Sequence, residues 1–308
     1  MISSIAGDAP SRGAASFATI QNELRSGTVS PLNPVEETSV NPSHAAKAFA
    51  AVARRELTRF VNQTGRLASA VVRPALWLIV VGAGFQNVLG ISITPPYETY
   101  VTYQVYMVPG LMGIVLLFQG MQSSLSMVYD REMGVMRLLL TAPLPRWYLL
   151  LCKLLAGVVL SVLQAYAFMI VAVIVGIDIP PWGFLTVLPA LIAAGIMMGA
   201  LGLLMSVTIR QLENFAGTMN FVIFPMFFLS TALYPIWRLK ESGATWLAWL
   251  AQLNPFTYGV ELIRFALYGK FDWLAAVVVI GCALAFFLGA TYGYDPQRAF
   301  QRRPAPAG

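Results

Sequence analysis

The 308-residue sequence contains very little charge. Only 11% of its residues are Asp, Glu, Lys or Arg, whereas 57% are hydrophobic. Soluble domains carry about 25% charged residues, which a chain of this size needs to cover its surface. The shortage excludes an ordinary soluble enzyme and the disordered or collagen-like classes. An integral membrane protein remains.

Residue types that support catalysis are also scarce. The single histidine is His44, so the apolar segments have no histidine for a metal site or a catalytic triad. The two cysteines, Cys152 and Cys282, are too few for a disulfide framework. No Gly-x-x-x-x-Gly-Lys-Ser/Thr loop is present to bind ATP. We therefore expect no metal, no catalytic residue and no cofactor in this chain, and an external source of energy for anything it transports.

Long apolar runs are what the sequence does contain. A membrane-spanning helix needs about 20 mostly apolar residues. We predict an all-α integral membrane protein with six transmembrane helices within residues 67–293. The predicted spans are Leu67–Leu89, Tyr103–Leu125, Lys153–Ile177, Phe184–Val207, Phe215–Trp237 and Trp273–Gly293.

The positions of Lys and Arg predict the orientation of these spans across the membrane. Cytoplasmic loops carry an excess of cations. With a cytoplasmic N-terminus, only Arg238, Lys240, Arg264 and Lys270 of the 20 Lys and Arg residues fall outside. Both termini are therefore predicted to be cytoplasmic, with Arg73 at the mouth of the first span. Since topology accounts for the net charge of +6, no nucleic-acid partner is expected.

The regions outside the spans have distinct compositions. Residues 1–42, rich in Ser, Pro, Gly and Thr, are predicted to form a disordered cytoplasmic tail, and residues 294–308 a second tail. Residues 43–66 predict an amphipathic helix on the lipid headgroups, because one face is apolar and the other carries Lys47, Arg54, Arg55 and Arg59. The alternative is a short helix that packs on the protein's own loops.

The segment 129–146 favours a second short cytoplasmic helix. Asp130 and Glu132 suit a first helical turn, Met133 and Met136 begin an apolar repeat at helical spacing, and two prolines follow. A Met- and Leu-rich face is typical of a helix that docks into a groove of another protein. A helix lying on the membrane surface without a specific function is the alternative.

Residues 238–270 are too polar for a span and too apolar for a plain loop. The Asn254-Pro255 pair marks a break between two short apolar pieces, and aromatic residues surround it. We predict two re-entrant half-helices on the outer side, before the last span.

Small and polar residues within the spans allow two interpretations each. Gly195, Gly199 and Gly202 lie on one side of the fourth span and permit close helix contact, within the chain or across a dimer. The uncharged polar residues either face a pathway or form interhelical hydrogen bonds. These residues are Gln119, Gln122, Gln164 and Asn220.

Three stretches in this order resemble the type-2 ABC exporter permeases. They are Val-Pro-Gly at 108–110; Tyr-Asp-Arg-Glu-Met-Gly at 129–134 with Leu-Leu-Leu-Thr-Ala-Pro-Leu-Pro-Arg at 138–146 and Lys153; and Phe-Pro-Met-Phe-Phe-Leu-Ser-Thr-Ala-Leu-Tyr-Pro-Ile at 224–236 with Leu-Asn-Pro-Phe-Thr-Tyr at 253–258 and Arg264. The resemblance covers about residues 43–293. Thr231 departs from it, since a glycine is expected there.

The resemblance implies a permease subunit in the cell inner membrane. Two copies would form a homodimeric pathway, and two separate ABC ATPase subunits would bind ATP and Mg²⁺ and drive export. The substrate would be a glycan, a lipid-linked molecule or a hydrophobic small molecule. A membrane lipid or isoprenoid transferase, and a membrane anchor or assembly factor, are the alternatives.

The resemblance also implies roles for particular residues. The segment around Asp130–Thr141 would be a coupling helix in an ATPase groove, with a second contact at the turn from Arg210. The implied ATPase-coupling residues are Asp130, Arg131, Glu132, Met133, Met136, Arg137, Leu140, Arg210 and Glu213. The implied interface-helix residues are Arg54, Arg55 and Arg59, and the pathway or gate residues are Gln119, Gln164, Asn220, Asn254 and Pro255.

Overall fold

The computed structural model describes residues 49–51, 53–55, 58, 64–85, 95–133, 146–209 and 211–294. Within these ranges the regular structure is almost entirely helical. Six long helices are α3 (Thr64–Phe85), α4 (Tyr103–Glu132), α6 (Arg146–Ile174), α8 (Leu188–Thr208), α9 (Leu212–Phe228) and α13 (Trp273–Gly293). Four short helices are α7 (Gly183–Thr186), α10 (Ile236–Glu241), α11 (Thr245–Leu253) and α12 (Pro255–Leu267).

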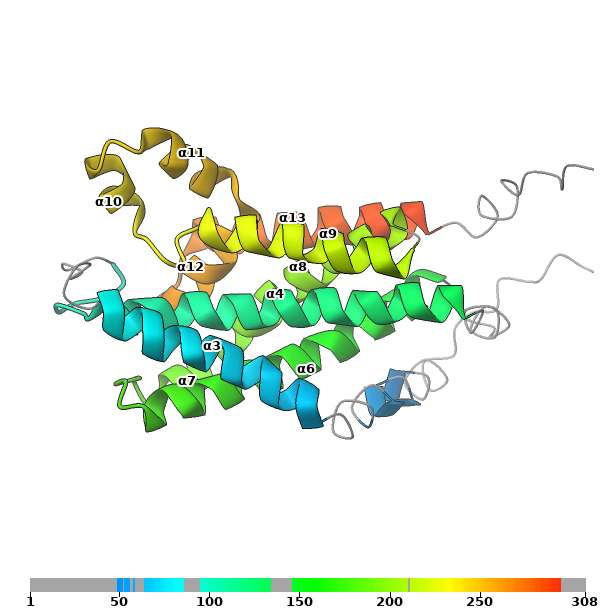
Figure 1. Cartoon of the computed structure of the whole chain (residues 1–308), viewed down its shortest axis with the longest axis horizontal. Coiled ribbons are helices and arrows are strands. Elements are labelled where there is room, and N and C mark those ends of the chain that lie inside the picture. The colour runs from blue at the N-terminus through cyan, green and yellow to red at the C-terminus, as the bar shows by residue number, and fades with distance from the viewer. Residues whose placement is uncertain are drawn as a thin grey trace, which may run out of the picture. The chain divides into compact units, whose positions relative to one another are not determined.

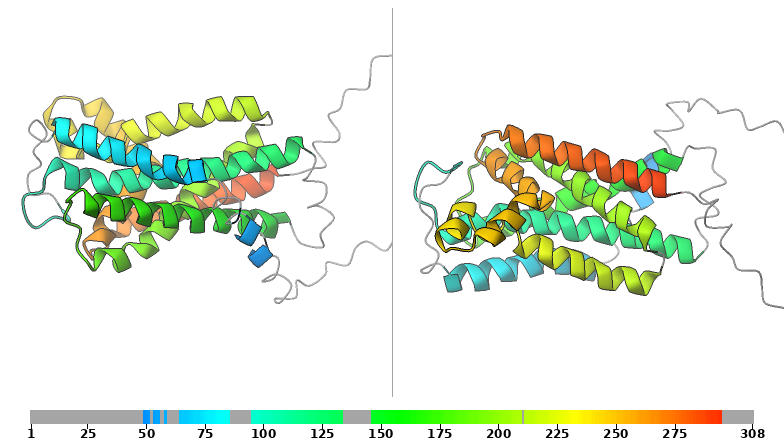
Figure 2. Two further views of the ribbon diagram at one scale, coloured as in Figure 1. Left: turned by 60° about the horizontal axis from the view of Figure 1, so that its bottom comes forward. Right: turned by 90° about the horizontal axis from the view of Figure 1, so that it is seen from above.

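The six long helices lie side by side and alternate in direction (Figures 1 and 2). The helices α4, α8 and α13 finish where α3, α6 and α9 start. We call this the Glu132 end, and the opposite one the Tyr103 end. The short helices α10, α11 and α12 lie at the Tyr103 end (Figure 1).

Four helical segments in the described ranges are long and apolar enough to cross a membrane. They are Tyr103–Asp130, Trp147–Ile174, Gly183–Thr208 and Trp273–Gly293. One face of α13 is more than half exposed and entirely apolar, as a lipid-facing surface requires; it includes Leu274, Val277, Ile280, Leu284 and Leu288. The prediction of an all-helical fold is confirmed for the described residues, and the four apolar segments are consistent with a membrane protein; six crossings and the side on which the termini lie stay predictions.

The three largest differences between the helix boundaries and the predicted spans are at the end of the second span, the start of the third and the end of the fifth. The sixth span has the predicted bounds, but α4 continues past Leu125 to Glu132, and α6 already begins at Arg146. The fifth prediction was wrong at its C-terminal end, because α9 stops at Phe228 and turns follow before α10. Apolar composition alone did not reveal this stop, which depends on a side chain from a distant part of the chain.

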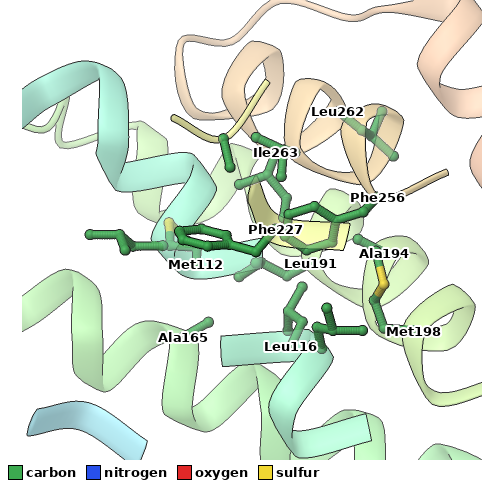
Figure 3. Packing of buried hydrophobic residues seen from close by; sticks show 14 of the residues in the cluster. Met112, Leu116, Ala165, Leu191, Ala194, Met198, Phe227, Phe256, Leu262 and Ile263 are labelled. Atoms are coloured by element: carbon green, nitrogen blue, oxygen red, sulfur yellow. The ribbon is translucent and has the colours of Figure 1, made fainter. Parts of the chain in front are cut away.

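The core lies where α4, α6, α8, α9 and α12 meet (Figure 3). The buried residues labelled there are Met112, Leu116, Ala165, Leu191, Ala194, Met198, Phe227, Phe256, Leu262 and Ile263. The ring of Phe227 on α9 meets the ring of Phe256 on α12 edge to face, with 6.4 Å between centroids. The short helix α12 therefore contributes to the centre of the bundle and is not a surface loop.

Glycines let α8 lie close to α4 and α6. A Cβ atom at Gly199 would be 2.6 Å from Leu154 Cδ1, and one at Gly202 would be 2.8 Å from the carbonyl oxygen of Gly120. Gly195 likewise faces Ser161 and Val158 of α6. The small-residue side of α8 is thus a contact within the chain, which excludes it as the surface of a dimer.

We expect Gly202→Ala to lower the stability of the protein by about 1–3 kcal/mol, because the added methyl group overpacks the contact with Gly120. The matched control is Gly217→Ala on α9, where nothing lies within 4 Å of the added atom. This control should be neutral or slightly stabilising, since Ala favours a helix over Gly. Thermal melting of the purified variants in one detergent measures both, and equal melting temperatures would contradict the packing.

Candidate functional site

A cavity of about 490 Å³ lies between α3, α4, α6 and α9, along the middle of the bundle. Its walls combine aromatic, aliphatic and amide side chains with a single arginine. The lining residues are Ser69, Arg73, Pro74, Trp77, Leu111, Ile114, Val115, Phe118, Gln119, Gln122, Gln164, Asn220, Phe224 and Phe227. Such a mixture of apolar walls with a few polar groups is typical of a small-molecule site.

All four polar residues predicted within the spans line this cavity. Gln164 Nε2 on α6 donates a hydrogen bond of 3.0 Å to Gln119 Oε1 on α4, and both side chains are buried. Both interpretations left open by the sequence therefore apply to these two residues: the glutamines form an interhelical hydrogen bond, and their side chains also line the cavity. Gln122 and Asn220 complete the polar lining.

Arg73 lies at the start of the apolar part of α3, which runs from Val72 to Gly82. Its guanidinium carbon is 4.6 Å from the centroid of the Phe118 ring, and Phe118 lies near the middle of α4. The helix α3 begins at Thr64, and at 1.5 Å per residue Arg73 is about 14 Å along its axis. The Arg73 side chain is exposed, and it reaches across to α4 beside the glutamines of the cavity lining.

Aromatic rings form the side of the cavity towards α3 and α9. Trp77 on α3 meets Phe227 edge to face, with 5.7 Å between centroids, and also contacts Phe228. Phe224 is 45% exposed and Asn220 is exposed as well, so the cavity reaches the surface of the chain along α9. Trp77, Phe224 and Phe227 were absent from the sequence-based site, because an aromatic residue in an apolar helix gives no signal of which way it faces.

A buried arginine organises the Tyr103 end. Arg264 on α12 is only 2% exposed; its Nη2 donates a 2.8 Å hydrogen bond to the carbonyl oxygen of Thr231. The Tyr106 hydroxyl donates to the same oxygen at 3.0 Å, and the Tyr106 ring faces the guanidinium at 4.1 Å. Glu261, one turn earlier on α12, forms an ion pair with Arg264. The turn after α9 is thereby attached to α4 and α12.

Asn254 has a structural role at the same junction. Its Nδ2 donates to the carbonyl oxygens of Met226 and Leu229, both at 2.7 Å, and its Oδ1 accepts from the backbone N–H of Phe256 at 3.0 Å. Carbonyls in the last turn of a helix lack partners within that helix. One side chain therefore satisfies the end of α9 and caps the start of α12, where Pro255 is the first residue.

Close backbone contact completes this junction. A Cβ atom at Gly110 on α4 would lie 2.6 Å from the carbonyl oxygen of Ala232. The Val-Pro-Gly stretch of α4 thus packs directly on the turn that follows α9. Residue 231 contributes its carbonyl oxygen to this junction, whereas the hydroxyl of the threonine that stands where the resemblance predicts glycine is buried without a hydrogen-bond partner.

We expect Asn254→Asp to destabilise the protein by about 2 kcal/mol, although the two side chains have the same shape. The carboxylate still caps α12, but it loses both donors and faces two carbonyl oxygens. Asn214→Asp in the exposed first turn of α9 is the matched control: Asn214 donates only to the Oε1 of the exposed Gln211, whose amide can turn to donate to a carboxylate, and a negative charge is tolerated there. Thermal melting should separate the two variants; similar values would contradict the role of Asn254.

A buried carboxylate connects three elements at the Glu132 end. Asp130 on α4 is 2% exposed, and its Oδ2 lies 2.6 Å from Lys153 Nζ on α6 and 3.6 Å from Arg55 Nη2. Arg55 belongs to the short stretch of helix described between residues 49 and 58. The sequence did not predict this contact between the two side chains, and the interface role of Arg55 and the coupling role of Asp130 stay predictions. Arg54, by contrast, is exposed.

The first residues of the predicted coupling helix belong to α4. Asp130, Arg131 and Glu132 form its last turn and not the first turn of a separate helix. Glu132 Oε1 accepts a 2.8 Å hydrogen bond from the backbone N–H of Leu212, and Met133 is 60% exposed beside it. Glu213 is exposed in the first turn of α9. The remaining predicted residues, Arg59, Met136, Arg137, Leu140 and Arg210, lie outside the described residues.

We expect Asp130→Asn to cost about 3 kcal/mol, because it leaves the Lys153 ammonium without its carboxylate. The double variant Asp130→Asn/Lys153→Met should lose less than the sum of the single variants, since neither charge is then left alone. Asp178→Asn in an exposed loop is the control and should be neutral. Additive losses in thermal melting would contradict the ion pair.

The fold and the cavity define a class of protein. Apolar helices long enough to cross a membrane surround a partly polar cavity, as in a membrane-embedded transport subunit. The sequence profile of the ABC-2 type transporter family matches residues 47–268. The chain belongs to this family and is a membrane subunit of an ABC transporter.

Named relatives agree with this assignment. The chain is 29% identical over 256 residues to ycf38 of Cyanophora paradoxa, a proposed transport permease, covering 82% of this chain and 84% of the relative. It is 27% identical to ycf38 of Porphyra purpurea, covering 72% and 74%. YbhR of Escherichia coli (strain K12), a proposed multidrug ABC transporter permease, is 26% identical over 171 residues, which cover 54% of this chain and 45% of YbhR.

Proposed function

We propose that this chain is the non-catalytic permease subunit of an ATP-binding cassette exporter in the inner (plasma) membrane. The observation that carries the proposal is the cavity in the middle of the bundle, with amide and aromatic side chains along its walls. A lipid transferase would require a carboxylate for acid chemistry or metal ligation. The described residues that line the cavity include none. Transport therefore fits the site better than group transfer does.

The Glu132 end supports docking of two ATPase subunits that bind ATP and Mg²⁺. The last turn of α4 and the first turn of α9 meet there through Glu132 and the Leu212 N–H, so the two proposed contact segments form one surface. The exposed Met133 and Glu213 would extend it. Asp130 would transmit movement, because it joins this surface to α6 and to the helix containing Arg55.

A homodimer would complete the pathway. The cavity reaches the chain surface along α9, where Phe221 and Phe224 are exposed, and Val72 and Leu76 are exposed on α3. A second copy would cover these apolar side chains and enclose the space between the two cavities. Movement of the ATPases, transmitted through α4, would then open this space to one side of the membrane at a time.

Co-purification with an ABC ATPase encoded beside this chain tests the proposal. We expect the wild-type chain to capture the ATPase and Met133→Ala to capture it about tenfold less, because an exposed apolar anchor is removed from the docking surface. The control is Trp182→Ala, which removes an exposed apolar side chain from the Tyr103 end and should leave capture unchanged.

Failure of the wild-type chain to capture any ABC ATPase, together with unchanged transport after Met133→Ala, would contradict the assignment. Export would be supported if a deletion strain accumulates substrate, and if the wild-type chain reverses this accumulation but a variant that no longer captures the ATPase does not.

A further inference from the structure

We infer that the cavity binds amphipathic molecules that carry an anionic group, with Arg73 as the contact for that group. The inference rests on the proposed function, because it takes the cavity as the substrate site. It adds the chemical class of the substrate, which neither the family nor the named relatives specify for this chain.

Charge within the cavity is the first observation. Among the residues that the structure describes, Arg73 is the only lining residue with a formal charge, and no carboxylate pairs with it. A cation within a membrane helix is costly, and such residues mark ligand or ion paths. The acidic residues of the same helices, Asp130 and Glu132 on α4 and Glu213 on α9, lie at the Glu132 end and not beside the cavity.

The geometry of Arg73 is the second observation. Its guanidinium lies against the ring of Phe118, with 4.6 Å from its central carbon to the ring centroid. A stacked guanidinium is held in place by the ring and keeps its in-plane N–H groups as donors, the arrangement that suits a carboxylate or phosphate. The ring therefore positions the cation without neutralising it.

The remaining lining matches the rest of such a molecule. Amide groups of Gln122 and Asn220 offer hydrogen bonds to polar atoms next to the anion. Trp77, Phe224 and Phe227 form an aromatic wall for an apolar body. A volume of about 490 Å³ lies in the range that accepts a drug-sized ligand. A cationic molecule would be repelled by Arg73 and would find no acidic partner in this lining.

The test compares two probes that differ only in charge. Dansyl-aminoundecanoic acid and its methyl ester are titrated into the full chain in phosphatidylcholine nanodiscs at neutral pH, where the carboxylate is ionised. We expect the wild-type chain to bind the acid about tenfold more tightly than the ester. Arg73→Gln should abolish the preference, whereas Arg73→Lys should retain most of it.

Arg238→Gln is the matched control, because Arg238 also stacks on an aromatic ring, that of Trp237, but lies on α10 outside the cavity. It should keep the wild-type preference. Equal binding of acid and ester by the wild-type chain, or a preference that survives Arg73→Gln, would overturn the inference.

Crosslinking of the wild-type chain provides a second measurement that does not depend on how Arg73→Gln folds. A diazirine-tagged form of the acid should label peptides of α3, α4 or α9 that line the cavity, and label confined to other segments would overturn the inference. ATPase capture is measured on the same preparations. Loss of the acid preference with intact capture contradicts this inference alone, whereas an intact preference without capture contradicts the proposed function alone.

Discussion

The structure depends most on the buried guanidinium of Arg264. Removing a charge from water costs several kcal/mol, so a buried arginine needs compensating partners. Here the carbonyl oxygen of Thr231, the carboxylate of Glu261 and the face of Tyr106 supply them, although the Nε of Arg264 has no hydrogen-bond partner. These partners come from the turn after α9, from α12 and from α4. Because the arginine requires all three, it determines where α9 must stop and where α12 must lie.

The cavity follows from that arrangement. The helix α9 ends at Phe228, where the Asn254 side chain donates hydrogen bonds to the carbonyl oxygens of Met226 and Leu229. Phe227, just before this end, contacts both the core and the cavity. The helix α4 runs from Tyr106 at one end, past Gln119 in the wall, to Asp130 at the other. One continuous helix therefore joins the Arg264 junction, the cavity and the surface proposed for the ATPase, which suits a protein that transmits a movement along its length.

Much of this could be predicted from the sequence, and the limits have physical reasons. Apolar runs predicted the long helices because a helix must satisfy its own backbone in lipid. The polar residues Gln119, Gln164 and Asn220 stood out because polar groups are costly there. The contact of Arg73 with Phe118 was not predictable, since the two residues lie on different helices. Asp130 was assigned to a surface because its partners, Lys153 and Arg55, are distant in sequence.

The sequence by itself determined the class of the protein, because composition and apolar periodicity depend only on the solvent that a segment must face. It also supplied the three stretches that mark the family. Only the tertiary structure decided that the first and third of these stretches meet at the Tyr103 end, that the α8 glycines pack within the chain, and that Arg73 lines a cavity. Each of these depends on which side chains from distant segments come within hydrogen-bonding or van der Waals distance, and a linear pattern does not contain that information.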